Sequence, residues 1–299
     1  MRLVGNRKTD RDAGEGRLFS RCANPRCATG WMRLWRNRRV PCFEGRWACS
    51  AECMQELVAA AARREMDRGL GASVPRPHRM PMGLMLIEQG RISPEQLQQA
   101  LAGQQRSVEE TGEAARLGAW LLRSGVLTEP ALARALSTQW SCPVFSLAGY
   151  RPEDVATAMP RFFSDALGAL PVRMAGGRLQ IAFAGPIDRS LSYAVGRMGG
   201  VRVDAGVACD SEWQIAQGRF LATREPETRF LEAASSWVLV RAMTRLIESE
   251  KAVEARLVRL HEYFWLRIWR RAAPDPALDA CDAVVDLLST VGTARKNSG

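Results

Sequence analysis

The pattern of apolar and polar positions between residues 81 and 139 occurs twice, with the second copy 35 residues after the first. Each copy predicts a short helix, a glycine turn and a second helix, because a repeat of this length is usually one supersecondary unit used twice. In both second helices two leucines and a glutamine stand at i, i+4 and i+7, so they share one helix face. The second copy consists of Arg116, Leu117, Gly118, Leu121, Leu122, Gly125, Val126, Leu127, Leu132, Leu136 and Gln139. The first consists of Met82, Gly83, Leu86, Ile87, Gly90, Ile92, Leu97, Leu101 and Gln104.

The second helix of each copy has a recognisable start. Ser93-Pro94-Glu95-Gln96 predicts a helix N-terminus, with serine as the cap, proline at the first helical position and glutamine at the third. Thr128 is the corresponding cap in the second copy. Gln104 and Gln139 each end an apolar stripe, so we expect each amide to bond either to protein or to a ligand.

After the repeat, the pattern changes to short strands alternating with helices. Two apolar runs around Gly176-Gly177 predict a β-hairpin, and Pro160 separates two short helices. We expect a small α/β layer with a largely antiparallel sheet. Its elements are predicted as a strand, two helices, a hairpin, a helix, a strand and a helix at 143–147, 152–167, 169–183, 186–198, 201–208 and 210–222.

The C-terminal part, 223–299, is expected to be helical, because large apolar residues recur there at helical spacing. The two main stripes are Val240, Met243 and Ile247, and then Val253, Leu257, Leu260 and Phe264. A final helix is predicted at about 277–290, after a break at Pro274 and Pro276.

We interpret 228–271 as an interaction surface, because large aromatic residues occur there on predicted helices that also carry many charges. These residues include Trp237, Phe264, Trp265 and Trp269. The alternative is that all of them pack on the α/β layer, since amphipathic helices usually face a core.

The cysteines indicate a metal site. Five of the eight lie between residues 22 and 53, while Cys142, Cys209 and Cys281 are scattered. The N-terminus does not read as a signal peptide and no apolar run has transmembrane length, so we expect a cytoplasmic protein. In a reducing compartment such a cluster favours metal over disulfides.

The spacing of these cysteines predicts a treble-clef-like zinc finger: a pair on a turn, a hairpin, and a second pair at a helix start. Cys49 and Cys53 are four residues apart, so one helical turn directs both sulfurs to one ion. Zinc favours four thiolates in tetrahedral geometry. The predicted ligands are Cys22, Cys27, Cys49 and Cys53, and Cys42 is expected to be a spare thiol. The alternative is a cluster of small buried thiols without metal.

Positive charge is concentrated in the N-terminal region. Residues 1–80 contain 16 Arg and one Lys against 8 acids, which gives +9 of the total +10. Arginines with interleaved tryptophans can bind nucleic acid through phosphate contacts and base stacking. The residues concerned are Arg33, Arg36, Arg38, Arg39 and Arg46, with Trp31, Trp35 and Trp47. The alternative is that the tryptophans pack beneath the zinc and the arginines form a solvated face.

The tandem pattern resembles the MshEN domain, the N-terminal domain of type II secretion and type IV pilus assembly ATPases. Its motif reads RLG, two aliphatics, G, two aliphatics, L, L and Q, and family members use two copies to bind cyclic di-GMP. The second copy here matches at every position, and the resemblance extends over about 81–222. The first copy departs from the motif: Pro81 replaces the arginine, Met82 the leucine and Arg91 an aliphatic residue. The segment between the copies, 105–115, is also longer than is usual in the family.

The resemblance implies a cyclic di-GMP site centred on the second copy. Arg116 would offer its guanidinium fork to O6 and N7 of a guanine, and backbone N–H groups near Gly118 would lie close to a phosphate. The leucines would form an apolar floor and Gln139 a polar end. The predicted ligand residues are Arg116, Leu117, Gly118, Leu121, Leu122, Gly125, Val126, Leu127, Leu132, Leu136, Gln139, Gly83, Gly90, Leu97, Leu101 and Gln104. The alternative is a pair of helical hairpins in which the leucines are core and Arg116 is solvated.

Pro81 predicts weaker binding than that of a family member with two complete motifs, because proline supplies neither charge nor donor. Arg79, two residues earlier, is the candidate replacement for the missing arginine.

The sequence does not predict an enzyme. None of the three lysines, Lys8, Lys251 and Lys296, follows a glycine, so a Walker A loop is missing from these 299 residues. No nucleophile with a base and an acid is evident either. We therefore expect a non-catalytic regulatory or adaptor protein of type II secretion, type IV pilus or motility machinery, with a protein partner there and no membrane insertion. The alternative is a regulator that binds nucleic acid through the basic finger.

The expected fold class is α+β. It comprises a treble-clef-like zinc finger, a helical tandem-motif subdomain, a small α/β subdomain with a mostly antiparallel sheet, and a helical C-terminal extension. The predicted segments are a basic arm at 1–18, the finger at 19–66, a linker at 67–80, the tandem-motif subdomain at 81–140, the α/β subdomain at 141–222 and the extension at 223–299.

Overall fold

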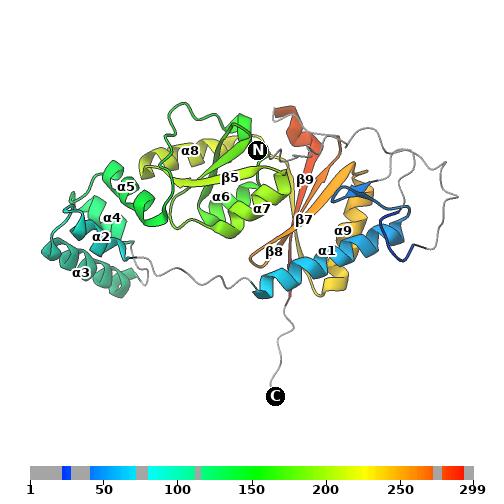
Figure 1. The fold of residues 1–299 in the computed structure, drawn as a ribbon, viewed down its shortest axis with the longest axis horizontal. Coiled ribbons are helices and arrows are strands. Elements are labelled where there is room, and N and C mark those ends of the chain that lie inside the picture. The colour runs from blue at the N-terminus through cyan, green and yellow to red at the C-terminus, as the bar shows by residue number, and fades with distance from the viewer. Residues whose placement is uncertain (1–21, 28–40, 72–79, 112–115, 272–277, 293–299) are drawn as a thin grey trace, which may run out of the picture.

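The structure is a computed structural model, and it describes residues 22–27, 41–71, 80–111, 116–271 and 278–292. Its parts follow one another along the long axis (Figure 1): a helical subdomain at one end, an α/β layer in the middle, and a sheet with two long helices at the other end. None of the described helices is both long enough and apolar enough to cross a membrane.

The helical subdomain contains the predicted repeat. Its helices are α2 (Met82–Glu88), α3 (Pro94–Thr111), α4 (Leu117–Arg123) and α5 (Glu129–Trp140). Gly90 and Gly125 follow the short helices with φ of 63° and 69°, the left-handed region that glycine adopts most readily. The predicted capping box of α3 forms, since Ser93 N–H donates to Gln96 Oε1 and Gln96 N–H donates to Ser93 Oγ. Thr128 occupies the cap position of α5, but its side chain makes no capping bond.

The core of this subdomain repeats with the same period as the sequence. Buried residues occur in pairs 35 positions apart: Leu86 with Leu121, Ile92 with Leu127, and Ala100 with Ala135. Helix α2 packs against α5, and α3 packs against α4. The two copies therefore build one hydrophobic core together. Helix α3 extends to Thr111, into the segment predicted as a connection.

The α/β layer follows the predicted order. It contains η3 (Pro152–Val155), α6 (Arg161–Leu167), β3 (Ala169–Ala175), β4 (Arg178–Phe183), α7 (Arg189–Gly199), β5 (Arg202–Val207) and α8 (Asp210–Ala222). Strand β4 lies between its neighbours, antiparallel to β3 and parallel to β5. The predicted first strand is reduced to a single bridge between Val144 and Val207.

The prediction of a helical C-terminal extension is wrong except for one helix. The segment folds as β6 (Glu227–Ala233), α9 (Ser236–Ser249), β7 (Glu254–Leu260), β8 (Tyr263–Trp269), η4 (Leu278–Ala283) and β9 (Val284–Val291). Five consecutive residues of β8 and six of β9 are buried. A strand covered on both faces is a near-continuous apolar run, and periodicity alone does not separate it from a buried helix.

The two ends of the chain build a single domain, which we call the composite domain. At its N-terminal end it contains β1 (Cys42–Phe43), β2 (Arg46–Trp47) and α1 (Ala51–Gly71). Strand β1 pairs in parallel with β7, so that the sheet order is β2-β1-β7-β8-β9-β6. The predicted division into a separate finger and a C-terminal extension does not hold. Helix α1 also continues to Gly71, into the predicted linker.

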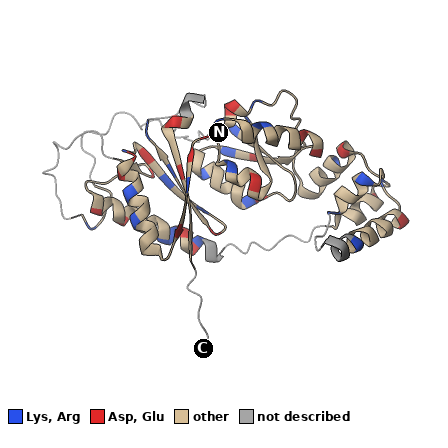
Figure 2. Ribbon diagram, turned by 180° about the vertical axis from the view of Figure 1, so that it is seen from behind, with Lys and Arg blue, Asp and Glu red and all other residues tan. Residues whose placement is uncertain are grey.

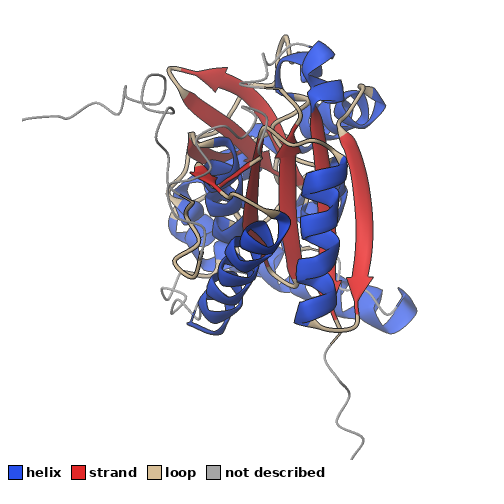
Figure 3. Ribbon diagram, turned by 90° about the vertical axis from the view of Figure 1, so that its right-hand side faces the viewer, coloured by secondary structure: helices blue, strands red, loops and turns tan. Residues whose placement is uncertain are grey.

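The central strands of the six-stranded sheet are covered on both faces. Helices α1 and α9 lie side by side on one face (Figure 3), where they bury Phe264, Leu266 and Ile268 of β8. The alternate residue Trp265 points to the other face and packs edge-on against Phe163 of the α/β layer, with ring centroids 5.3 Å apart. This accounts for the buried character of β8. The fold class is therefore α+β as predicted, with antiparallel pairs at β1–β2, β3–β4, β7–β8 and β8–β9.

Most aromatic residues of the proposed interaction surface are in or against the core. Phe264 and Trp265 are buried, and Trp269 is half-buried against the α/β layer. Trp237 at the start of α9 is 57% exposed, and Arg241 stacks on its ring at 4.4 Å. The surface hypothesis is thereby reduced to the start of α9 and the adjacent edge strand β6, where Phe230 is 61% exposed.

Candidate functional site

Arg116 lies where the helical subdomain meets the α/β layer. It precedes α4 in an extended conformation, and its side chain is exposed. Its Nη1 donates a hydrogen bond of 3.1 Å to the carbonyl oxygen of Ala184, in the turn between β4 and α7. In the described part of the chain no carboxylate is within ion-pair distance of this guanidinium. The N–H groups that do not face Ala184 are therefore open to an outside acceptor.

Gly185 lets the arginine come this close. A Cβ atom at this position would lie 2.6 Å from Nη1 and 3.2 Å from Cζ of Arg116. Nothing in the sequence except a Gly-Pro turn pair pointed to residues 184 and 185, which are far along the chain from the motif. A second contact links the same two parts, since Glu129 Oε2 accepts from the N–H of Ser211 at 3.1 Å.

The apolar motif residues divide into core and surface. Leu121 and Leu127 are buried in the core of the helical subdomain, and Leu117 and Val126 are packed partly against it. Leu122, Leu132 and Leu136 are half-buried. Of their equivalents in the first copy, Ile87 and Leu97 are half-buried and Leu101 is 48% exposed.

The motif glycines Gly83 and Gly118 are buried beneath a leucine of the same copy. A Cβ at Gly83 would lie 2.6 Å from Leu97, and one at Gly118 would lie 3.0 Å from Leu132. The part of the motif exposed to a ligand is therefore limited to the half-buried leucines and the residues at the helix ends.

The side-chain amide of the glutamine in the second copy is hydrogen-bonded to the protein backbone. Gln139 Nε2 donates to the carbonyl oxygen of Met80 at 3.1 Å, so the end of the second copy is bonded to the start of the first. Pro81 and Arg91, which depart from the motif, are both exposed. Arg79 lies outside the described residues.

The four predicted metal ligands come together. The Sγ atoms of Cys22, Cys27, Cys49 and Cys53 all lie within 4.8 Å of one another. Four sulfurs at about 2.3 Å from one zinc ion would be about 3.8 Å apart, so a small adjustment of the side chains suffices. Cys27 and Cys49 are 3.4 Å apart at their sulfurs, and Cys49 and Cys53 are 3.6 Å apart.

Two N–H groups donate to sulfur atoms of the cluster, an arrangement that suits metal-bound thiolates. The N–H of Cys49 donates to Cys22 Sγ at 3.4 Å, and Nδ2 of the buried Asn24 donates to Cys53 Sγ at 3.3 Å. Without a cation, burial raises the pKa of the Cys22 thiol to about 12, whereas a bound metal would reverse that effect. Asn24, between the first two cysteines, was not predicted. Cys42 lies in β1 outside this group.

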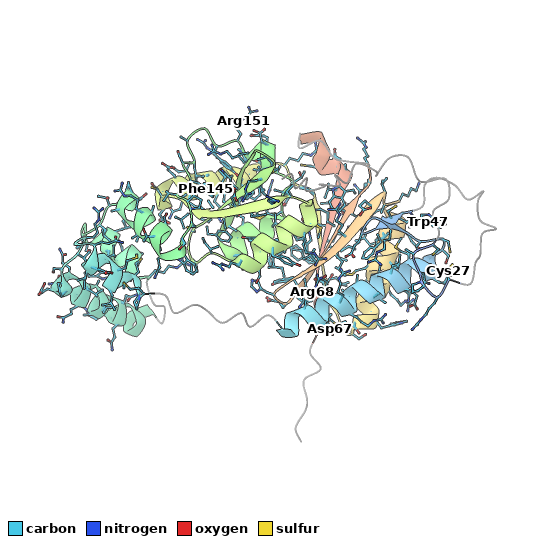
Figure 4. The ribbon with its side chains drawn as sticks, viewed as in Figure 1. Cys27, Trp47, Asp67, Arg68, Phe145 and Arg151 are labelled. Carbon is cyan, nitrogen blue, oxygen red and sulfur yellow. The ribbon has the colours of Figure 1, made fainter. Side chains whose placement is uncertain are left out.

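Of the residues predicted to contact nucleic acid, the structure describes Arg46, which is exposed, and Trp47. Trp47 is half-buried against the core that contains Cys49. Figure 4 shows Trp47 and Cys27 together at the beginning of α1, with Asp67 and Arg68 at its other end. Basic and acidic residues are interspersed over the described elements (Figure 2). The arginines and tryptophans between 31 and 39 lie outside the described residues.

Comparison with known proteins supports the resemblance of the middle of the chain. Residues 140–227 match the family model of the MshEN domain. The resemblance predicted from the motif is thus confirmed, and the matched residues are those of the α/β layer directly after the second copy.

One curated protein and several solved structures are similar to about half of this chain. The type IV pilus assembly ATPase PilB of Myxococcus xanthus is 25% identical over 146 residues, which is 48% of this chain and 25% of PilB. The chain thus matches about a quarter of the length of that relative. Among solved structures, MshE with cdg is 28% identical, covers 48% of this chain and 99% of its own, and has a TM-score of 0.38. The N-terminal domain of XpsE is 22% identical over 46% of this chain and 92% of its own, with a TM-score of 0.35.

Proposed function

We propose that this chain is a non-catalytic regulatory or adaptor protein of type IV pilus or type II secretion machinery in the cytoplasm, and that it binds cyclic di-GMP. The observation that carries the proposal is the complete second motif, whose leading Arg116 is exposed beside a domain that matches MshEN. The PilB relative supports the setting. A catalytic role is not proposed, because these 299 residues contain no Gly-Lys pair for a phosphate-binding loop.

Arg116 is the residue that would recognise the guanine. Its guanidinium has five N–H donors in a rigid fork, which suits the adjacent O6 and N7 acceptors of guanine. Leu132 and Leu136 retain exposed surface on α5 and would contact the apolar face of the base. A bidentate contact of this kind contributes about 1–3 kcal/mol.

The first motif would contribute much less. Pro81 occupies the position equivalent to Arg116, so the first copy has neither a charge nor a side-chain donor there. We therefore expect cyclic di-GMP to bind more weakly than to a protein with two complete motifs. Arg79→Ala should weaken cyclic di-GMP binding only if Arg79 substitutes for the missing arginine.

Isothermal titration calorimetry with cyclic di-GMP tests the proposal. Arg116→Ala should weaken binding by about tenfold or more, since tenfold corresponds to the lower part of the range for one bidentate contact. Arg123→Ala is the matched control, because Arg123 is an exposed arginine at the other end of the same helix. Absence of heat at saturating ligand, or equal losses in both variants, would contradict this function.

We also propose that Cys22, Cys27, Cys49 and Cys53 hold one structural zinc ion. The sulfur separations and the two N–H donors at the cluster support this assignment. Bound zinc would fix the first cysteine pair to the start of α1. Elemental analysis of protein purified without chelators should give about one zinc per chain, and the Cys49→Ser variant should lose it. A metal-free wild-type protein would refute the assignment.

A further inference from the structure

The turn between β4 and α7 holds Arg116 by backbone groups alone. The carbonyl oxygen of Ala184 accepts from Nη1, and the guanidinium lies directly against the Cα of Gly185. Distances from an added Cβ at Gly185 would be 2.6 Å to Nη1, 3.2 Å to Cζ and 3.3 Å to Nη2. A side chain at position 185 would therefore collide with all three of these guanidinium atoms.

This arrangement orients the guanidinium and leaves most of its N–H donors available to a ligand. One N–H of Nη1 is engaged, and Arg116 remains exposed, so the edge with Nε and Nη2 can still form two parallel hydrogen bonds. A long side chain on a surface ordinarily loses rotamer freedom when it binds. In this protein the contact with Ala184 already restricts the Arg116 side chain before a ligand binds.

We infer that Gly185 is a positioning residue for the nucleotide site, and that the site is shared between the helical subdomain and the α/β layer. Gly185 keeps space for the guanidinium and Ala184 orients it, so that the fork is ready for the O6 and N7 acceptors of a purine base. The inference rests on the proposed function, because it assumes that Arg116 reads guanine.

Gly185→Ala is the sharpest test because it removes this space with little effect on folding. Gly185 does not have a left-handed φ, and the atoms that a Cβ would meet belong to the far end of a flexible side chain. The guanidinium therefore moves, and the backbone remains in place. Gly218→Ala is the matched control: Gly218 lies in α8, and a Cβ there would have no neighbour within 4 Å.

Binding and base preference are measured by calorimetry with cyclic di-GMP and cyclic di-AMP. Gly185→Ala should weaken cyclic di-GMP binding about tenfold, as loss of the bidentate contact would, and should reduce the preference for guanine over adenine. In an Arg116→Ala background it should cause no further loss, since the two residues act through the same contact. Unchanged affinity and preference in Gly185→Ala would overturn the inference, as would an additional loss in the double variant.

A measurement without ligand separates this inference from the proposed function. The NMR signal of the Arg116 Nε–H group should shift in Gly185→Ala and stay in place in Gly218→Ala. If the wild-type protein fails to bind cyclic di-GMP, the proposed function fails, while a shifted signal still upholds the positioning contact. A signal that stays in place in Gly185→Ala would overturn the positioning role whatever the protein binds.

Discussion

At the scale of single residues, the carboxylate of Glu65 joins α1 to both α7 and β7. Its side chain is 3% exposed in α1, where Oε1 accepts from Arg197 of α7 at 2.9 Å. Oε2 accepts from the backbone N–H of Arg259 in β7 at 3.3 Å. Burial acts to raise the pKa of Glu65, but the hydrogen bonds from Arg197, Arg259 and Arg64 outweigh it and lower the pKa overall.

Glu65→Gln should therefore destabilise the protein by about 2 kcal/mol near neutral pH, because a charge-assisted hydrogen bond is weakened. The wild-type advantage is fully present above the ordinary glutamate pKa of about 4.3 and disappears as the pH falls through the lowered folded value. Urea unfolding of the wild-type and Glu65→Gln proteins at several pH values measures this difference in stability. Glu88→Gln, an exposed glutamate of α2, is the control and should show neither effect.

At the scale of elements, the two copies of the repeat are not packed identically. In the second copy Trp120 stands where the first has Met85, and its indole lies against Gly103 of α3. A Cβ at Gly103 would lie 2.0 Å from Nε1 and 2.4 Å from Cε2 of the ring. The glycine is thus required by the contact between α3 and α4, since a rigid ring must be displaced as a whole.

Gly103→Ala should lower the free energy of unfolding of the helical subdomain by about 1–3 kcal/mol, the usual cost of overpacking. Gly218→Ala should instead be neutral or stabilising by up to about 1 kcal/mol, because alanine favours an exposed helix interior. Thermal unfolding of the two variants compares them directly. Equal stability of both would show that the Trp120 contact does not constrain position 103.

At the scale of the whole molecule, the cysteine cluster belongs to the composite domain. Cys49 and Cys53 lie in the same hydrophobic cluster as α9 and the sheet residues Leu257 and Leu266. Strand β1 hydrogen-bonds to β7, so the first finger strand is also part of the sheet. The N-terminal finger therefore supports the sheet that the C-terminal segment builds.

Loss of the metal should therefore increase local unfolding in the composite domain as well as in the finger. In Cys49→Ser, hydrogen exchange should accelerate in α1, α9 and β7, whereas α2–α5 should keep wild-type protection, because a small metal-bound unit depends on its ion. Cys209→Ser is the control, since Cys209 lies outside the cluster at the start of α8. Acceleration confined to residues 22–54 would show that finger and sheet are independent.

Local signals predicted much of this architecture. The repeat, the capping box at Ser93, the hairpin at Gly176-Gly177 and the ends of α8 all depend on residues close in sequence. The gathering of four cysteines followed from their spacing and redox chemistry.

The C-terminal sheet was missed for two physical reasons. The β7–β8 turn contains His261 with a φ of 53° and no glycine, so the usual hairpin signal is absent. Strand β8 is covered by α1 and α9 on one face and by the α/β layer on the other, so its polar–apolar alternation is lost. The contact of Arg116 with Ala184 was missed because it spans 68 residues and involves only backbone on one side.

The most direct measurement of the central claim is hydrogen exchange of the zinc-loaded chain with and without saturating cyclic di-GMP. Slower exchange is predicted in α4 and the start of α5, and in the turn at 184–188 that carries Arg116's backbone partners. The first copy, α2 and α3, should change less because Pro81 replaces its arginine. Unchanged exchange at both α4 and the 184–188 turn, or protection confined to the composite domain, would contradict the account.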